Sequence, residues 1–206
     1  MKLFCVRHGE TFYNLEGRIQ GQTNSRLSPL GQRQCEAVAQ RLVDQAIDAV
    51  ISSPLERAID SAQVIADKVG VTLATDPRLM EINAGIFQGL TWPEINDRYA
   101  AEAARWKTQD PDFRIPQGES RRDVMLRAQA AFDAIRASGK RSVVVLAHGG
   151  SLSAALKSLL GIPPERNPFT LANGSITTLV WESEVRLLAL NETGHLHGLM
   201  SGDGDL

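Results

Sequence analysis

The chain opens with Leu3-Phe4-Cys5-Val6-Arg7-His8-Gly9-Glu10-Thr11, and the remaining sequence can be interpreted around this stretch. The four apolar residues at positions 3–6 predict a short buried strand, which ends where Gly9 allows a turn. The strand carries Arg7 and His8 at its carboxyl end, the end at which ligands bind in open α/β sheets. The pair fits either a polar turn that closes a strand or a site for an anion, and the rest of the chain has to decide between them.

Composition narrows the classes of protein to consider. With 206 residues, we expect a single domain over residues 1–206. The formal net charge of −2 predicts neither a nucleic-acid partner nor a membrane partner. Cys5 and Cys35 lack the spacing of metal or redox motifs and are interpreted as reduced packing residues. No apolar run has the length of a signal peptide or a membrane span, so we expect a soluble, cytoplasmic protein.

Strands and helices alternate over the first third of the chain. Ser28-Pro29 predicts the start of a helix that runs to about residue 42, and residues 49–52 predict a second strand. Ser53-Pro54 repeats the cap-and-proline signal before an amphipathic helix over residues 54–69, and residues 71–74 predict a third strand. This β-α-β-α-β order predicts a parallel sheet with right-handed crossovers.

The regular alternation of strands and helices is lost over residues 78–122, which we interpret as an insertion that covers the ligand site at the carboxyl ends of the strands. Its aromatic residues could select a substrate or could simply pack the insertion onto the domain. Regular elements return with a helix that begins after Ser120, a continuous strand at residues 142–147, a helix at 151–160 and a final hairpin of strands at 175–181 and 185–190.

Basic residues follow three of the predicted strands. Arg7 and His8 end the first, Arg57 lies in the first turn of the helix after the second, and His148 ends the strand at 142–147. In a parallel sheet these side chains share one edge, where their mutual repulsion is relieved by a bound anion. The sequence therefore predicts a phosphate site.

The same residues supply the groups that phosphoryl transfer needs. A neutral imidazole can attack phosphorus and form a phosphohistidine, and arginines grip phosphate oxygens while remaining charged. A proton donor for the leaving oxygen is also required. The candidate is Glu81, which follows the third strand among apolar neighbours that would favour its protonated form.

Several motifs together resemble the histidine phosphatase superfamily, the phosphoglycerate-mutase-like group. They cover nearly the whole chain in the family's order, and are Val6-Arg7-His8-Gly9-Glu10-Thr11, Asn14, Arg18-Ile19-Gln20-Gly21, Leu27-Ser28-Pro29-Leu30-Gly31, Ser52-Ser53-Pro54-Leu55-Glu56-Arg57 and Leu146-Ala147-His148-Gly149-Gly150. The resemblance implies an α/β fold of three α/β/α layers around a mostly parallel central sheet, and catalysis without a metal or another cofactor.

The resemblance also implies roles for individual residues. His8 would be the phosphorylated nucleophile, with Glu81 as the proton donor. Glu10 would shape the loop that follows His8, whereas Thr11 could either shape this loop or contact the substrate. The residues implied to hold the phosphoryl group or line its pocket are Arg7, Asn14, Gln20, Arg57, His148 and Gly149.

The segment after Glu81 separates two activities within the superfamily. Phosphoglycerate mutases carry Glu-Arg-His-Tyr-Gly there, whereas this chain has Glu81-Ile82-Asn83-Ala84-Gly85 and lacks the arginine and the tyrosine. It is similar instead to the cofactor-independent phosphatase branch. We therefore expect a phosphatase that acts on a small phosphorylated metabolite; the alternatives are a phosphoglycerate mutase and a phosphoester-binding protein without catalysis.

Two further expectations concern metals and assembly. His195-Leu196-His197 has a spacing that two metal ligands could use, but no carboxylate or cysteine set completes the site, so packing of the tail against the domain is the favoured interpretation. The expected partner is a small phosphomonoester, and the protein could be a monomer or a homodimer.

Overall fold

A central six-stranded sheet organises the computed structural model, which describes residues 1–200. Its strand order is β3-β2-β4-β1-β5-β6. The β3-β2-β4-β1 part is parallel, whereas β5 runs antiparallel to both β1 and β6, so the predicted mostly parallel sheet is confirmed. The strands are β1 (Lys2–Arg7), β2 (Ala49–Ser52), β3 (Leu73–Thr75), β4 (Ser142–Ala147), β5 (Ile176–Trp181) and β6 (Val185–Glu192).

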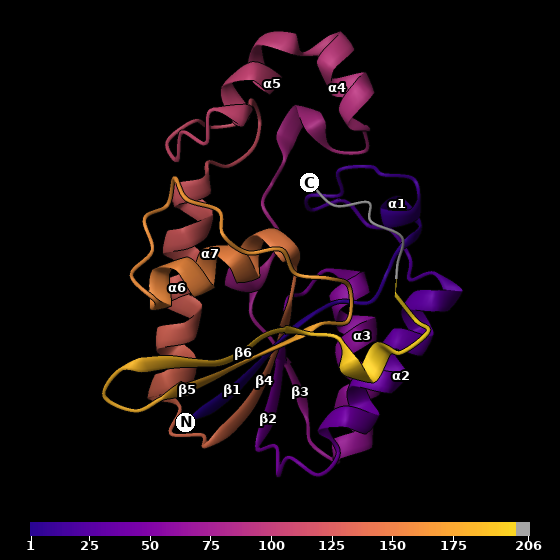
Figure 1. The fold of residues 1–206 in the computed structure, drawn as a ribbon, viewed down its shortest axis with the longest axis vertical. Coiled ribbons are helices and arrows are strands. Elements are labelled where there is room, and N and C mark those ends of the chain that lie inside the picture. The colour runs from indigo at the N-terminus through magenta and orange to yellow at the C-terminus, as the bar shows by residue number, and fades with distance from the viewer. Residues whose placement is uncertain (201–206) are drawn as a thin grey trace.

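Helices flank the sheet on both faces, as expected for three α/β/α layers. In Figure 1, α6 and α7 lie on one side of the sheet and α2 and α3 on the other, while α4 and α5 lie beyond the carboxyl ends of β1, β2 and β4. The helices are α1 (Phe12–Leu15), α2 (Pro29–Leu42), α3 (Glu56–Val69), α4 (Trp92–Arg98), α5 (Ala100–Lys107), α6 (Arg121–Ala137) and α7 (Gly149–Leu159), with short 3-10 turns at Pro77–Leu79, Gly85–Phe87 and Gly194–Leu196.

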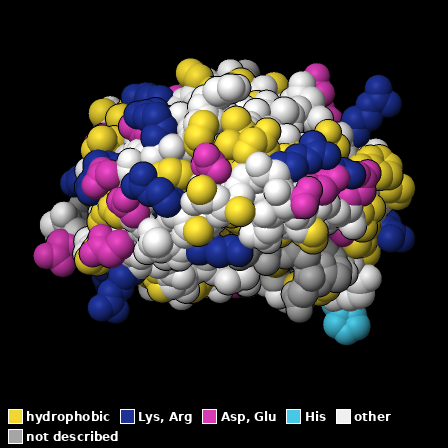
Figure 2. Space-filling model, turned by 90° about the horizontal axis from the view of Figure 1, so that it is seen from above, with side chains coloured by type: hydrophobic (Ala, Val, Ile, Leu, Met, Phe, Trp, Pro, Cys, Tyr) yellow, Lys and Arg dark blue, Asp and Glu magenta, His cyan; other side chains and the backbone are white. Residues whose placement is uncertain are grey.

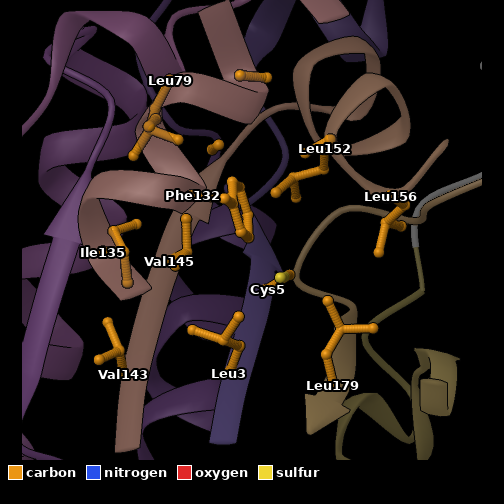
Figure 3. Close-up of a cluster of buried hydrophobic side chains, with 14 of the residues drawn as sticks. Leu3, Cys5, Leu79, Phe132, Ile135, Val143, Val145, Leu152, Leu156 and Leu179 are labelled. Atoms are coloured by element: carbon orange, nitrogen blue, oxygen red, sulfur yellow. The ribbon is translucent and has the colours of Figure 1, made fainter. Parts of the chain in front are cut away.

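The strand β1 is buried on both faces because side chains alternate along it. Leu3 and Cys5 pack against α6 and α7, in the cluster that Figure 3 shows around Phe132. Phe4 and Val6 face the opposite layer of α2 and α3. The run of four apolar residues thus serves two cores at once, and its carboxyl end delivers Arg7 and His8 to the edge of the sheet.

Local signals set most helix ends, with one informative exception. Ser28 caps α2 as predicted, because its Oγ accepts a hydrogen bond from Gly31 N. By contrast, the predicted start of α3 at Pro54 is wrong: Leu55 is still extended, and the helix begins at Glu56. The expected cap, Ser53, accepts a hydrogen bond from Leu55 N at 3.3 Å and also hydrogen-bonds to His148 Nε2 at 2.8 Å, so its side chain joins the start of this segment to the site.

The segment between β3 and α6 has a small core of its own. Phe87, Ile95, Phe113 and Ile115 form a third hydrophobic cluster, against which other aromatic residues of the segment pack. Three cationic residues of this segment are also engaged locally: Arg105 stacks on Phe113, Lys107 lies over Trp92 and Arg114 pairs with Asp123 of α6. From the first turn of α6, Arg121 stacks on Trp106. These contacts agree with a packing role for the aromatic residues, whereas their role in covering the site or selecting a substrate stays a prediction.

Both cysteines are free and buried, in agreement with their interpretation as packing residues. Burial raises the pKa of the Cys5 thiol to about 12. Among residues 1–200, no helix has the length and apolar character to cross a membrane. The face that carries α4 and α5 intersperses Lys and Arg with Asp and Glu, without a basic stripe among its coloured residues (Figure 2).

Candidate active site

His8 lies just beyond the end of β1, with 2% of its surface exposed. Its Nδ1 is 2.7 Å from the carbonyl oxygen of Gly9. Because a carbonyl can only accept, Nδ1 carries the proton and Nε2 keeps the lone pair. Burial, followed by the charges of Arg57 and Arg7, lowers the pKa of His8 well below 6.5. The ring is therefore neutral at pH 7, with one nitrogen free to act as a nucleophile.

Arg57 approaches that nitrogen from the first turn of α3. Its Nε donates to His8 Nε2 at 3.3 Å, and its two terminal nitrogens donate to the carbonyl oxygens of Thr23 and Gly21 at 2.9 and 2.7 Å. Only 1% of the residue is exposed, and burial lowers its pKa to about 10, which still leaves it charged at pH 7. The loop at residues 21–23 thus fixes the guanidinium beside the lone pair of His8.

His148 faces His8 from the N-cap of α7. The two ring centroids are 5.1 Å apart, at an interplanar angle of 59°. Burial and the charge of Arg57 lower the pKa of His148 well below 6.5, so this ring is also neutral at pH 7. Its Nε2 bonds to Ser53, whereas the buried Nδ1 has no hydrogen-bond partner within the described part of the chain. A buried polar atom without a partner is costly and is consistent with a ligand group.

Arg7 completes the cationic side of the site. Its Nη1 donates to the carbonyl oxygen of Leu171 at 2.5 Å. Its guanidinium also lies against Gly149, since a Cβ at that position would be 3.6 Å from Arg7 Cζ. Arg7 and the first turn of α7 therefore lie side by side, and a helix N-terminus favours anions through its free N–H groups and its dipole.

The carboxylate of Glu81 meets the same helix start. Its oxygens accept hydrogen bonds from the backbone N–H groups of Gly150 and Ser151, and from its own neighbour Ile82, each at 2.9 Å. The sequence predicted apolar surroundings for this half-buried carboxyl group, whereas its oxygens meet backbone N–H groups of α7. A Cβ at position 150 would lie 2.5 Å from Glu81 Oε1, so Gly150 makes this approach possible.

Thr11 and Asn14, in the loop that follows His8, form hydrogen bonds mainly with each other. Thr11 caps α1, and both its N–H and its hydroxyl donate to Asn14 Oδ1 at 3.1 and 3.0 Å. Asn173, which the sequence did not single out, donates to the carbonyl oxygen of His8 at 3.1 Å and to Asn14 Oδ1 at 3.4 Å. Asn14 is thus linked to His8 through Asn173, and a substrate contact for Thr11 stays a prediction.

Glu10 precedes this loop in the sequence, and Gln20 follows it. Glu10 is buried, accepts from the hydroxyl of Ser28 at 2.6 Å and donates its N–H to Gln34 at 2.8 Å, which agrees with a loop-shaping role. Gln20 directly precedes Gly21, the residue that holds Arg57, and its Oε1 is buried without a hydrogen-bond partner in the described structure. The latter atom is available to a ligand.

A glycine permits the close approach of this loop to α2. Gly31 packs on the main chain at Glu10, so that a Cβ there would overlap the Glu10 carbonyl oxygen. We expect Gly31→Ala to lower the free energy of unfolding by about 1–2 kcal/mol, because an overlap costs about 1–3 kcal/mol and alanine in a helix returns roughly 0.5–1 kcal/mol. Urea denaturation measures the change. Gly194→Ala is the control, since its Cβ would meet no atom within 4 Å; equal stabilities for the two variants would contradict the packing.

The lowered pKa values of the histidines predict a pH-dependent stability. His8 and His148 stay neutral in the folded protein but take up protons in the unfolded chain below pH 6.5. The unfolded state then binds more protons, so stability falls as pH drops below 6.5, by up to about 2.7 kcal/mol per pH unit for two groups. Denaturation at pH 7, 6 and 5 tests this. The slope should shrink in His148→Gln but not in His197→Gln, which alters an exposed histidine.

The whole chain can now be compared with known proteins. A family model of the histidine phosphatase superfamily (branch 1) matches residues 3–193, which include every residue of the site described above. The chain belongs to this superfamily. Its match extends beyond the opening motif to the end of the sheet, so the resemblance of the motifs is confirmed over the full fold.

Individual relatives within the histidine phosphatase superfamily carry different names. A protein of Yersinia pestis named probable phosphoglycerate mutase GpmB is 38% identical over 79% of this chain and 76% of its own length. The structure of mycobacterial glucosyl-3-phosphoglycerate phosphatase with VO3 has a TM-score of 0.83 at 33% identity, covering 92% of this chain and 98% of that one. A mutant phosphoserine phosphatase from Entamoeba histolytica with phosphoserine has a TM-score of 0.84 at 31% identity, covering 95% and 98%.

The two C-terminal histidines, His195 and His197, do not belong to a group of metal ligands in the described residues. His195 Nε2 hydrogen-bonds to the carbonyl oxygen of Gly174 at 2.9 Å, and His197 is exposed. Among residues 1–200, no three or more His, Cys, Asp or Glu side chains are grouped to hold a metal ion. The contact of His195 agrees with packing of the tail against the domain.

Proposed function

We propose that this protein is a phosphomonoester hydrolase that acts through a phosphohistidine at His8. The observation that carries the proposal is the state of the His8 ring: neutral, fixed by Nδ1–H to Gly9, with the Nε2 lone pair beside Arg57. This is the arrangement of an activated nucleophile next to a cationic phosphate-binding group. Membership of a superfamily that contains phosphatases and mutases supports it.

In the first step, His8 Nε2 attacks the phosphorus atom, and the bond from phosphorus to the ester oxygen breaks. Arg7 and Arg57 would neutralise the charge on the phosphoryl oxygens, and His148 would supply a polar contact from its unpartnered side. Because these side chains are held by backbone carbonyls and Ser53, the site needs little rearrangement to receive the group.

Proton transfer is assigned to Glu81. Protonated from the solvent before the first step, its carboxyl would give this proton to the departing oxygen, and the resulting carboxylate would then accept a proton from the water that attacks the phosphohistidine. This second attack releases inorganic phosphate and restores the neutral His8. The contact of the Glu81 carboxylate with the first turn of α7, the helix that His148 caps, supports this assignment.

The proposed substrate is a small phosphorylated metabolite. Two of the similar structures are of phosphatases named for compounds of this class, glucosyl-3-phosphoglycerate and phosphoserine. A screen of phosphomonoesters for phosphate release, with His8→Ala as the blank, tests the activity. Brief incubation with a labelled ester should leave label on the protein that acid removes and alkali does not. Absence of His8-dependent phosphate release across the screen would refute the proposal.

A phosphoglycerate mutase is the second candidate, because the Yersinia relative carries that name. Against it stands the segment after Glu81, which lacks the arginine and tyrosine expected of mutases and instead bonds through Asn83 to Glu119. Incubation with 3-phosphoglycerate, followed by 31P NMR, separates the two activities. Free phosphate supports the hydrolase, whereas conversion to 2-phosphoglycerate with little phosphate supports the mutase.

We also propose that hydrolysis needs no metal ion, since arginine and histidine side chains supply the groups around the phosphoryl oxygens. Dialysis against EDTA is expected to change kcat/KM by less than about twofold, because the cationic groups of such a site are covalent parts of the chain. Steady-state assays before and after dialysis, with and without added Mg²⁺, measure this. A loss that only metal restores would contradict the expectation.

A further inference from the structure

Arg127, on α6, binds the main chain of the segment that carries Glu81. Its Nη1 donates to the carbonyl oxygens of Arg78 and Met80 at 2.8 and 2.5 Å, and its Nη2 donates to that of Glu81 at 2.9 Å. Residues 81–84 belong to no helix or strand, so secondary structure does not satisfy their polar groups. Arg127 supplies hydrogen bonds that a sheet or helix would otherwise provide.

Glu119 extends this support to the other side of Glu81. Its two carboxylate oxygens accept from Arg127 Nε and Nη2 at 2.8 and 2.9 Å, a bidentate pair. The carboxylate also accepts from Asn83 N at 2.8 Å, and Glu119 N donates to Asn83 O at 2.9 Å. With side chains only 17% and 20% exposed, Arg127 and Glu119 hold the backbone from residue 78 to residue 83.

We propose that Arg127 and Glu119 are positioning residues for proton transfer by Glu81. The inference rests on the proposed phosphatase activity. The Glu81 carboxylate has its own partners on α7, but their geometry depends on where the main chain of Glu81 lies, and that is set by Arg127 and by Gln22, whose Nε2 donates to the same carbonyl at 3.0 Å. Small displacements of a catalytic group are costly, so loosening this support impairs the acid before it unfolds the domain.

The dependence of rate on the leaving group separates positioning from general structural support. When His8 Nε2 bonds to phosphorus, the electron pair of the breaking P–O bond goes to the ester oxygen. An alkoxide needs the Glu81 proton, whereas 2,4-dinitrophenolate leaves as a stable anion. A displaced Glu81 therefore slows hydrolysis of glycerol phosphate far more than that of 2,4-dinitrophenyl phosphate. The quantity kcat/KM reports the steps up to release of the leaving group.

The experiment compares Arg127→Lys and Glu119→Gln with the wild-type protein on both substrates. We expect kcat/KM for glycerol phosphate to fall about tenfold or more, part of the range that acid–base catalysis supplies, and that for dinitrophenyl phosphate to fall less than about threefold. Glu81→Gln should show the same selectivity to a larger degree. Arg122→Lys is the matched control, because Arg122 lies on the same helix and pairs with the exposed Asp112.

The ratio of the two rates does not depend on how much of a variant is folded, since both substrates report on the same sample. The inference is supported if kcat/KM for glycerol phosphate, divided by kcat/KM for dinitrophenyl phosphate, falls in both variants and does not fall in Arg122→Lys. An unchanged ratio overturns it, whether both rates fall together or neither changes. If the wild-type protein shows no His8-dependent hydrolysis of either ester, the proposed function itself fails, which is a distinguishable result.

Discussion

Replacing His8 with alanine is expected to abolish phosphate release, with kcat/KM reduced by at least about 10⁴-fold, the scale seen when a covalent nucleophile is removed. The neighbouring imidazole, His148, has its ring centroid 5.1 Å from that of His8, and its Nε2 is hydrogen-bonded to Ser53. Steady-state assays on glycerol phosphate and on dinitrophenyl phosphate measure the loss, which should be similar for both esters because the nucleophile serves each of them.

The fold should survive this substitution. His8 contributes a neutral ring, and its carbonyl oxygen, which accepts from the Asn173 side chain and from Gly174 N, is kept when the side chain is replaced. Circular dichroism and the urea midpoint provide the check. If folded His8→Ala retained a tenth of the wild-type rate on both esters, the assignment of His8 as nucleophile would be wrong.

The second large effect is expected for Arg57→Lys, with kcat/KM lowered by about 10²–10³-fold, as for loss of one preorganised donor to a transition-state oxyanion. Lysine keeps the charge but cannot bind His8 Nε2 and the carbonyls of Gly21 and Thr23 together, since its single ammonium replaces a planar fork. The phosphoryl group would then meet a displaced cation.

Comparison with Arg41→Lys isolates the effect of geometry from that of the residue type. Arg41 is an exposed residue of α2 that forms a 3.6 Å ion pair with Glu192, so its replacement should leave the rate unchanged. The two variants are compared through kcat, KM and the yield of labelled phosphoenzyme. A full rate in Arg57→Lys would show that charge alone is sufficient and would contradict the need for a fixed guanidinium.

The sequence alone determined the layers of the fold and the elements that carry the chemistry. The apolar run at residues 3–6 could only be a strand buried on both faces, because all four side chains avoid water while alternating in direction. The caps at Ser28 and Ser120 and the left-handed Gly70 also follow from neighbouring residues, since a cap or a turn is decided within a few positions. The alternation of strands and helices predicted the parallel sheet, whose shared edge brings Arg7, His8, Arg57 and His148 together.

Only the tertiary structure decided which polar atoms meet. Ser53 carried the signal of a helix cap, yet its hydroxyl also hydrogen-bonds to His148, 95 residues away. Glu81 has apolar neighbours in sequence, yet its carboxylate rests on the N–H groups of α7. Arg127 gave no sequence signal at all, because its partners are main-chain carbonyls, which every residue possesses. Hydrogen bonds between distant segments depend on packing in three dimensions, and a linear pattern does not encode them.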